Sequence, residues 1–248
     1  MPIHLSIDLG NSSFKLSRFS GNKFISQKKF AVDDYDSVLV YCQKQKATAA
    51  ILSSVVKHPK IFEKALRQIF PLLVFDHRTP LPFANKYGSP QTLGYDRLAA
   101  AAGGWQLFPG FNVLVIEAGT CIKYDVISKK NEYLGGAIAP GLQMRFAALH
   151  HFTQKLPLVG KTAKTPLLGR TTEESIRSGV QQAVLAETAG MIGAYRKQFP
   201  GLKIVLGGGD SAFFAGRLKT RIFVRPNIVA EGMHVILKYN VEKGFLEI

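Results

Sequence analysis

An acidic residue, a short polar turn and a lysine lie close together near the start of the chain. In the segment DLGNSSFK, Asp8 and Lys15 flank a turn made of glycine, asparagine and serine. The backbone N–H groups of such a turn can bind an anion, and the lysine adds a positive charge. Asp8 is placed to hold Mg²⁺ or its water shell. The segment predicts a phosphate-binding hairpin; the alternative is an ordinary β-hairpin whose polar turn binds nothing.

A second segment repeats this pattern 109 positions later, counted from Asp8 to Glu117. Residues 116–127, IEAGTCIKYDVI, contain the acid, a glycine, Thr120 and an alternating strand that carries a lysine. The offset has the size of a domain rather than of a solenoid repeat. Two copies favour phosphate binding, with a nucleotide clamped between two hairpins. The chain has no Walker loop, and no GxGxxG follows the first strand.

A third candidate is the segment YGSPQTLGYDR, residues 87–97, which ends at the start of a predicted helix. The helix dipole favours an ionised Asp96, which is suited to accept a proton from a hydroxyl group. Arg97 can bind a carboxylate or a phosphate through both branches of its guanidinium group. The alternative is that Asp96 only caps its helix while Arg97 extends its charge into water.

Two glycine-rich segments complete the candidates. Residues 135–141, GGAIAPG, and residues 207–210, GGGD, are expected to form flexible turns. The second directly follows an apolar strand, so its backbone can approach a flat ligand or a phosphate; close packing is the alternative. His150 and His151 lack zinc-ligand spacing, and Ser12 lacks a visible His–Asp partnership, so neither a zinc site nor a hydrolase triad is predicted.

These candidates require an alternating α/β framework, and the rest of the chain provides one. The best internal break is FPGF at residues 108–111, which separates an alanine-rich helical stretch from an apolar strand. We therefore expect two halves, residues 1–109 and 110–248, with a cleft between them. Further strands are predicted over residues 49–55, 72–75 and 203–206, and helices over residues 58–70, 96–108, 171–199 and 227–240.

The composition is that of a globular protein. The 248 residues are 46% hydrophobic and 20% charged, which excludes a disordered or fibrous chain. No apolar run is long enough to span a membrane, and the first ten residues do not resemble a secretory signal. Cys42 and Cys121 cannot form a disulfide framework, so we expect a reducing, cytoplasmic environment.

The formal net charge is +15, from 32 Lys and Arg against 17 Asp and Glu. Such an excess could serve nucleic acid, a membrane surface or small anionic substrates. The basic residues are scattered and no run exceeds two, which indicates a solvated surface.

Taken together, these segments resemble the type III pantothenate kinase family of the actin-like ATPase and sugar-kinase superfamily. The resemblance runs in order from about residue 3 to residue 240. It rests on six segments: DLGNSSFK and EAGTCIKYD as the two phosphate motifs, YGSPQTLGYDR as the pantothenate motif, GGAIAPG as the interface motif, TEESIRSG, and LGGGD on the adenosine side.

The resemblance implies an α/β fold of two similar ribonuclease H-like, actin-like ATPase domains with a nucleotide cleft between them. The domain of residues 1–109 would carry the first phosphate and pantothenate motifs, and that of residues 110–248 the remaining motifs. It also implies ATP-dependent phosphorylation of pantothenate to 4'-phosphopantothenate, the first step of coenzyme A synthesis, with Mg²⁺. The enzyme would be a cytoplasmic homodimer whose partner subunit helps to close the pantothenate pocket, with no nucleic-acid or membrane partner.

The same resemblance assigns roles to individual residues. Asp96 would be the general base, and Asp8 would organise Mg²⁺ through water. The ATP site would comprise Asp8, Leu9, Gly10, Asn11, Ser12, Ser13, Phe14, Lys15, Thr120, Gly207 and Gly208. The pantothenate site would comprise Tyr87, Gly94, Tyr95, Asp96, Arg97 and Thr172.

One position departs from the family pattern. The second phosphate motif of the family begins with Asp, which coordinates a monovalent cation, K⁺ or NH₄⁺, whereas this chain has Glu117. The extra methylene displaces the carboxylate from a site that requires fixed cation–oxygen distances. We therefore expect monovalent-cation use to be weakened or rearranged.

Two other functions remain as alternatives. Another small-molecule kinase or phosphatase of the superfamily is one, although the GYDR segment with Tyr87 upstream argues against it. The other is a non-catalytic regulator that binds nucleic acid through the net charge of +15. The presence of Asp8, Lys15 and Asp96 argues against a non-catalytic protein.

Overall fold

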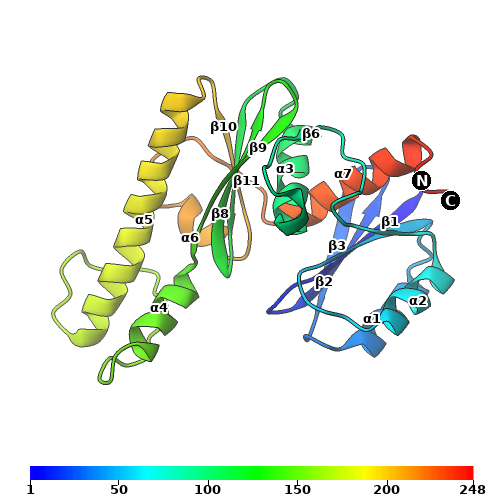
Figure 1. The fold of residues 1–248 in the computed structure, drawn as a ribbon. Coiled ribbons are helices and arrows are strands. Elements are labelled where there is room, and N and C mark those ends of the chain that lie inside the picture. The colour runs from blue at the N-terminus through cyan, green and yellow to red at the C-terminus, as the bar shows by residue number, and fades with distance from the viewer. Residues whose placement is uncertain (248) are drawn as a thin grey trace.

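The computed structural model describes residues 1–247, which form two mixed β-sheets with helices around and between them (Figure 1). The first sheet has the order β3-β2-β1-β4-β5 and the second the order β11-β10-β7-β8-β9-β6. The first sheet contains β1 (Ile3–Leu9), β2 (Phe14–Ser20), β3 (Lys23–Phe30), β4 (Ala49–Ser54) and β5 (Leu72–Val74). The second contains β6 (Ala84–Asn85), β7 (Val113–Ala118), β8 (Cys121–Ser128), β9 (Glu132–Pro140), β10 (Lys203–Gly207) and β11 (Phe223–Val224).

The two sheets share one topology. In each, three antiparallel strands joined by hairpins are followed by two parallel strands on the other side of the first strand. The strands β1, β2, β3, β4 and β5 therefore correspond to β7, β8, β9, β10 and β11. This correspondence confirms the prediction of two similar α/β units, which came from the repeated hairpin alone.

The helices lie where parallel connections require them. They are α1 (Tyr35–Lys44), α2 (Lys60–Ile69), the short η1 (Pro90–Thr92), α3 (Tyr95–Leu107), α4 (Leu142–His151), α5 (Thr172–Gln198), α6 (Ser211–Ala215) and α7 (Ile228–Glu242). Helices α1 and α2 cover the outer face of the first sheet, and α4, α5 and α6 the outer face of the second (Figure 1). Helices α3 and α7 lie between the sheets, and one apolar cluster there joins β4, β7 and both helices.

Helices α3 and α7 approach each other closely because small residues line their contact. A Cβ atom on Gly232 of α7 would overlap the carbonyl group of Ala99 in α3, and one on Gly103 would lie 2.8 Å from the carbonyl oxygen of Ile228. The run of buried alanines in α3, which the sequence shows at residues 99–102, serves the same contact. The contact fixes the position of α3 relative to both sheets.

Each half also contributes an element to the other. Strand β6 comes from the first half of the chain but pairs in parallel with β9 of the second sheet. Helix α7 ends the second half but packs against β1 and β4 of the first sheet. The division into residues 1–109 and 110–248 stays a prediction.

The predicted element ends agree with the observed ones to within two residues for β4, β5, β10, α2, α3, α5 and α7. One segment was predicted wrongly. Residues 135–140 are not a flexible turn but the second part of β9. Gly135 has a φ of +90° beside a β-bulge, and a Cβ atom on Gly136 would overlap the carbonyl of Tyr124. These glycines therefore permit a bent strand. Within residues 1–247, no helix combines the length and apolar character that a membrane span requires.

Candidate active site

The two repeated hairpins meet at their turns. The turn between β1 and β2 is closed by a hydrogen bond from the N–H of Gly10 to the carbonyl of Ser13, at 3.3 Å. The hydroxyl oxygens of Ser12 and Thr120 lie 3.4 Å apart, although the two residues are 108 positions apart in the chain. The turns of both halves thus border one space.

The side chains of this first turn point in two directions. Leu9 and Phe14 are fully buried in the core of the first sheet, so only their backbone groups can face a ligand. Asn11 and Ser12 are exposed, and Lys15 is half-buried. The alternation places polar atoms and backbone N–H groups on the side where the two turns meet.

Three carboxylates and two lysines gather beside these turns. Asp8 and Glu117 each lie one residue before the end of their strands, β1 and β7, and Asp96 lies in the first turn of α3. Burial raises the pKa of Asp8 to about 6; Lys15 opposes this shift, whereas Asp96 and Glu117 add to it. Asp8 therefore lies within electrostatic range of both other carboxylates.

Lys123 of β8 joins two of these carboxylates. Its Nζ atom lies 2.5 Å from Oδ2 of Asp96 and 2.8 Å from Oε2 of Glu117. Burial alone would lower the pKa of Lys123, but the charges and hydrogen bonds of Glu117 and Asp96 outweigh burial and raise it. Lys123 is therefore charged at neutral pH.

Asp96 is held at the helix start by its own backbone environment. Gly94 precedes the helix in an extended conformation, and a Cβ atom there would lie 2.7 Å from Oδ1 of Asp96. That Oδ1 atom accepts a hydrogen bond from the N–H of Arg97, at 2.9 Å. The helix dipole favours negative charge at this position. Asp96 thus faces the space beside the hairpins with one oxygen directed by the helix and the other by Lys123.

Arg97 does not extend into water, so the surface alternative for it is wrong. It is 4% exposed and donates from Nε and Nη2 to Oδ1 of Asp125, at 2.9 and 2.7 Å. The hydroxyl of Tyr133 donates to the same oxygen, at 2.7 Å. The guanidinium carbon lies 5.5 Å from the centre of the Tyr87 ring. Arg97 therefore ties α3 to β8 and brings Tyr87 next to the start of α3.

The remaining predicted residues lie at different distances from this centre. The ring of Tyr95 packs against Phe75, with centroids 5.4 Å apart. Gly207 ends β10, and Gly208 follows with a φ of +87°; a Cβ atom there would overlap the backbone of Ala118 in β7. The glycine turn thus lies against the second hairpin. Thr172 opens α5 and is exposed, and no hydrogen bond or ion pair of the described chain links it to the carboxylates.

Three residues of this centre were absent from the predicted site: Lys123, Asp125 and Tyr133. The signal for the first two was present in the sequence. Lys123 and Asp125 alternate along β8 and so lie on one face of the sheet, opposite the adjacent Asp96 and Arg97 of α3. Lys123 pairs with Asp96, and Asp125 pairs with Arg97, so the two charges of the strand are opposite to the two charges at the start of the helix. Tyr133 carried no comparable signal.

The donor set has the chemistry that Mg²⁺ prefers, although within residues 1–247 no group of three or more His, Cys, Asp or Glu could hold a metal ion alone. Mg²⁺ is usually held by one or two carboxylates together with substrate phosphates. A cation beside Asp8 would also relieve the repulsion that Asp96 and Glu117 exert on it. The residues therefore fit a Mg²⁺ ion that arrives with a nucleotide.

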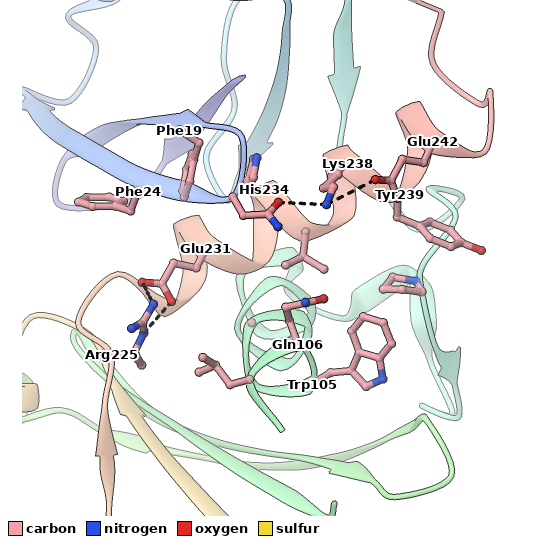
Figure 2. Close-up of a pocket in the computed structure, with 15 residues that line it drawn as sticks. Phe19, Phe24, Trp105, Gln106, Arg225, Glu231, His234, Lys238, Tyr239 and Glu242 are labelled. Carbon is pink, nitrogen blue, oxygen red and sulfur yellow. Dashed lines mark hydrogen bonds and ion pairs between the residues drawn. The ribbon is translucent and has the colours of Figure 1, made fainter. Parts of the chain in front are cut away.

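A separate cavity of about 400 Å³ lies between the β2–β3 hairpin, α3 and α7 (Figure 2). Several of its charged groups already have partners: Arg225 pairs with Glu231 at 3.0 Å, and Lys238 pairs with Glu242 at 3.4 Å. In the part of the chain that the structure describes, its lining includes none of the predicted ATP or pantothenate residues. This cavity is therefore distinct from the site formed by the carboxylate cluster.

Comparison with known proteins identifies the family of the chain. Residues 4–194 match the model of the type III pantothenate kinase family. The chain belongs to this family. The type III pantothenate kinase of Christiangramia forsetii is 41% identical over 240 residues, covering 96% of this chain and 99% of that protein. The type III pantothenate kinase of Bacteroides fragilis is 38% identical over 239 residues, covering 96% and 98%. The family prediction from the six segments is thereby confirmed.

Solved structures confirm the fold of this pantothenate kinase family member. A Campylobacter jejuni protein assigned to the Baf family of transcriptional activators superposes with a TM-score of 0.64 at 21% identity, covering 96% of this chain and 99% of the other. A ROK family glucokinase of Streptomyces griseus, in complex with glucose and AMPPNP, has a TM-score of 0.55 at 10% identity, covering 93% and 97%. At such identities the likeness concerns the fold alone, which is that of actin-like ATPases and sugar kinases.

Proposed function

We propose that the chain transfers the terminal phosphoryl group of ATP to the primary hydroxyl of pantothenate, giving 4'-phosphopantothenate for coenzyme A synthesis. The observation that carries the proposal is the position of Asp96, beside Asp8 and the meeting point of the two hairpin turns. A proton acceptor next to a phosphate-binding cleft is what phosphoryl transfer to an alcohol requires. Membership of the type III pantothenate kinase family supplies the substrate.

In this proposal the first hairpin binds the phosphates of ATP. The N–H groups of residues 11–13 and the ammonium of Lys15 would contact phosphate oxygens, and Thr120 would approach from the other turn. Gly207 and Gly208 would leave room on the adenosine side. Asp8 would hold Mg²⁺ through water, and the bound Mg²⁺ would neutralise charge on the phosphates.

Asp96 would act as general base towards the hydroxyl group of pantothenate. The pKa of an alcohol lies far above that of any aspartate, so Asp96 orients the hydroxyl first and takes its proton as the new P–O bond forms. Each carboxylate oxygen has two lone pairs, so Oδ1 and Oδ2 can each accept one more hydrogen bond beyond those from Arg97 and Lys123.

The pantothenate pocket would be lined by Tyr87, Gly94, Tyr95 and Arg97. The bonds from Arg97 to Asp125 use Nε and Nη2, so Nη1 is outside this pair and is the group that would face the substrate. Because Thr172 lies at the exposed start of α5, on the outer side of the second half in Figure 1, we propose that it reaches pantothenate in the pocket of a second subunit.

A homodimer is part of the proposal, and exposed apolar side chains support it. Ile138 of β9, within the interface segment, is 60% exposed, and Leu167 and Leu168, just before α5, are 82% and 77% exposed. Exposed apolar side chains in the segment that resembles the interface motif, and in the segment just before α5, are candidates for burial against a second subunit. We also propose that the protein acts in the cytoplasm, which the free thiols of Cys42 and Cys121 support.

The test is release of ADP that depends on added pantothenate, measured with Mg²⁺ for the wild type and for Asp96→Asn. Turnover by the wild type, with strong loss in the variant, is the expected result. Glucose in place of pantothenate tests the alternative of another small-molecule kinase. Absence of any turnover, combined with salt-sensitive binding of DNA or RNA, would overturn the proposal in favour of a nucleic-acid-binding regulator.

A further inference from the structure

Lys123 occupies the centre of the acidic cluster rather than its edge. Its ammonium group bridges Asp96 and Glu117 at 2.5 and 2.8 Å, and all three side chains are at most 21% exposed. Asp8 is close enough for Lys123 to lower its pKa, against the rise that burial imposes. One positive charge thus serves three carboxylates from the two halves of the molecule.

The backbone fixes this position. Glu117 and Lys123 are directly paired across the antiparallel strands β7 and β8. Two residues further along β8, Asp125 binds the buried Arg97 and so holds the strand against the start of α3. Lys123 therefore cannot leave Asp96 unless its side chain turns away from both carboxylates.

A K⁺ ion at the position that the family motif gives it, beside Glu117, does not fit this arrangement. Oε2 of Glu117 already accepts from the ammonium of Lys123, and the carboxylate of Asp96 accepts from the same group. An ammonium group has the charge of K⁺ and is close to it in size. A second monovalent cation would have to displace Lys123 against electrostatic repulsion.

From this disagreement we infer that Lys123 is the built-in monovalent cation of the site and a positioning residue for Asp96. The inference rests on the proposed kinase function. The ammonium fixes Oδ2 of Asp96 and reduces repulsion among Asp8, Asp96 and Glu117 when the phosphates of ATP arrive. The enzyme consequently needs no K⁺ or NH₄⁺ from solution.

The experiment compares potassium, ammonium and tetramethylammonium chlorides at equal ionic strength, because the last cation is too bulky for the site. Pantothenate-dependent ADP release and melting temperature are measured for the wild type, Lys123→Ala and Lys238→Ala. Lys238 is the matched control, because it also pairs with a glutamate, Glu242, but lines the separate cavity away from the carboxylate cluster.

For the wild type we expect rates within about twofold in the three salts, since its own lysine holds the site. Lys123→Ala in tetramethylammonium should lose kcat on the order of 10²-fold, with the KM for ATP changed far less. Ammonium or potassium should raise the kcat of Lys123→Ala saturably, to at least about a tenth of the wild-type value. The same ions should raise the melting temperature of Lys123→Ala by about 3 °C. Lys238→Ala should behave as the wild type in every salt.

Saturable activation of the wild type by K⁺ of tenfold or more would overturn the inference, and this result does not depend on the folding of any variant. A folded Lys123→Ala whose rate and melting temperature ignore all three cations would also overturn it. If the wild type shows no pantothenate-dependent turnover, the proposed function fails; the melting temperatures then decide about Lys123 independently.

Discussion

The β1–β2 and β7–β8 hairpins carry the same acid–lysine pair in the same place but use it differently. Asp8 is paired across the strands with Lys15, and Glu117 with Lys123. Within the described chain, Lys15 makes no ion pair with Asp8, whereas Lys123 binds both Glu117 and Asp96. The first lysine thus remains available to a ligand, and the second is held by the protein.

The difference has a structural cause outside the hairpins. The start of α3 brings Asp96 to the second hairpin, so its lysine has two carboxylates within hydrogen-bonding distance. Two charge-assisted bonds hold an ammonium group more firmly than one cross-strand neighbour does. The comparison teaches that one duplicated element can leave its lysine without an ion pair in one half and hold it between two carboxylates in the other. In the proposed function the first lysine would bind phosphate and the second would position the general base.

The largest effect on activity is expected for substitution of Asp96, which lies beside both hairpins. Replacing Asp96 with Asn removes the proposed proton acceptor and the charge that pairs with Lys123, so kcat for pantothenate phosphorylation should fall on the order of 10²–10⁴-fold. Steady-state kinetics measure the loss, with Asp36→Asn on the surface of α1 as a control of equal charge change. A loss of kcat below tenfold for Asp96→Asn would show that Asp96 is not the general base.

The buried ion pair between Arg97 and Asp125 of the second hairpin should contribute more to the free energy of unfolding than an exposed ion pair of the first half does. Asp125→Ala leaves the guanidinium of Arg97 buried without its carboxylate, and the free energy of unfolding should fall by about 3–5 kcal/mol. Chemical denaturation checks this value. Glu63→Gln breaks the exposed pair with Arg67 on α2 and should cost less than about 1 kcal/mol. Equal losses from both variants would contradict the expectation.

Substitution of Lys15, which makes no ion pair in the described chain, should have a different effect from substitution of Lys123. Lys15→Ala removes the proposed charged donor to phosphate, worth about 1.5–3 kcal/mol, so the KM for ATP should rise about 10–150-fold. Potassium or ammonium ions should not restore the affinity, because no carboxylate pair holds them at that position. Restoration of Lys15→Ala by these ions to the extent expected for Lys123→Ala would erase the distinction between the hairpins.

The smallest effect is on the pH dependence of stability, and it arises where His4 of β1 contacts His234 of α7. Burial lowers the pKa of His234 to about 4, with His4 and Lys238 adding to the shift, and the rings of His4 and His234 are 3.2 Å apart at Nδ1 and Nε2. Below the unfolded pKa of about 6.5 the unfolded chain binds protons that the folded chain excludes, so stability falls with falling pH. Between pH 7 and pH 5 the contribution of His234 to stability should fall by about 2 kcal/mol. Buried Asp8, whose pKa is raised, changes stability in the opposite direction over this interval, so the effect of His234 is measured as a difference between two proteins.

Thermal unfolding of the wild type at the two pH values measures this loss, and His234→Gln serves as the comparison. That variant has no imidazole at the buried position, so on going from pH 7 to pH 5 its stability should rise by about 2 kcal/mol relative to that of the wild type. An equal change in both proteins would assign the acid sensitivity to other groups.

Much of the framework could be predicted because local patterns determine it. The alternation of β1 and β2, the apolar run of β4 and the acid at the start of α3 are properties of adjacent residues. The duplication was also visible, since Asp8 and Glu117 begin similar segments. These signals were sufficient for the two-sheet fold and for the family.

What could not be predicted depends on contacts between distant segments. The pairing of Lys123 with Asp96 requires the packing of β8 against α3, which no local pattern contains. The bent strand at residues 135–140 looked like a turn because glycines usually break strands, whereas here they accommodate the carbonyl of Tyr124. The destination of α7 was likewise undetermined by its own amphipathic pattern.

The position of α7 has a consequence for how the protein is made. Strand β1 leaves the ribosome first, but the helix that covers its inner face is the last helix of the described chain. The hydroxyl of Ser6 in β1 donates to the carbonyl of Ala230 in α7, a contact that spans 224 positions. During synthesis the first sheet therefore waits with one apolar face uncovered until the second half has emerged. The covering of this face is therefore a late event in folding.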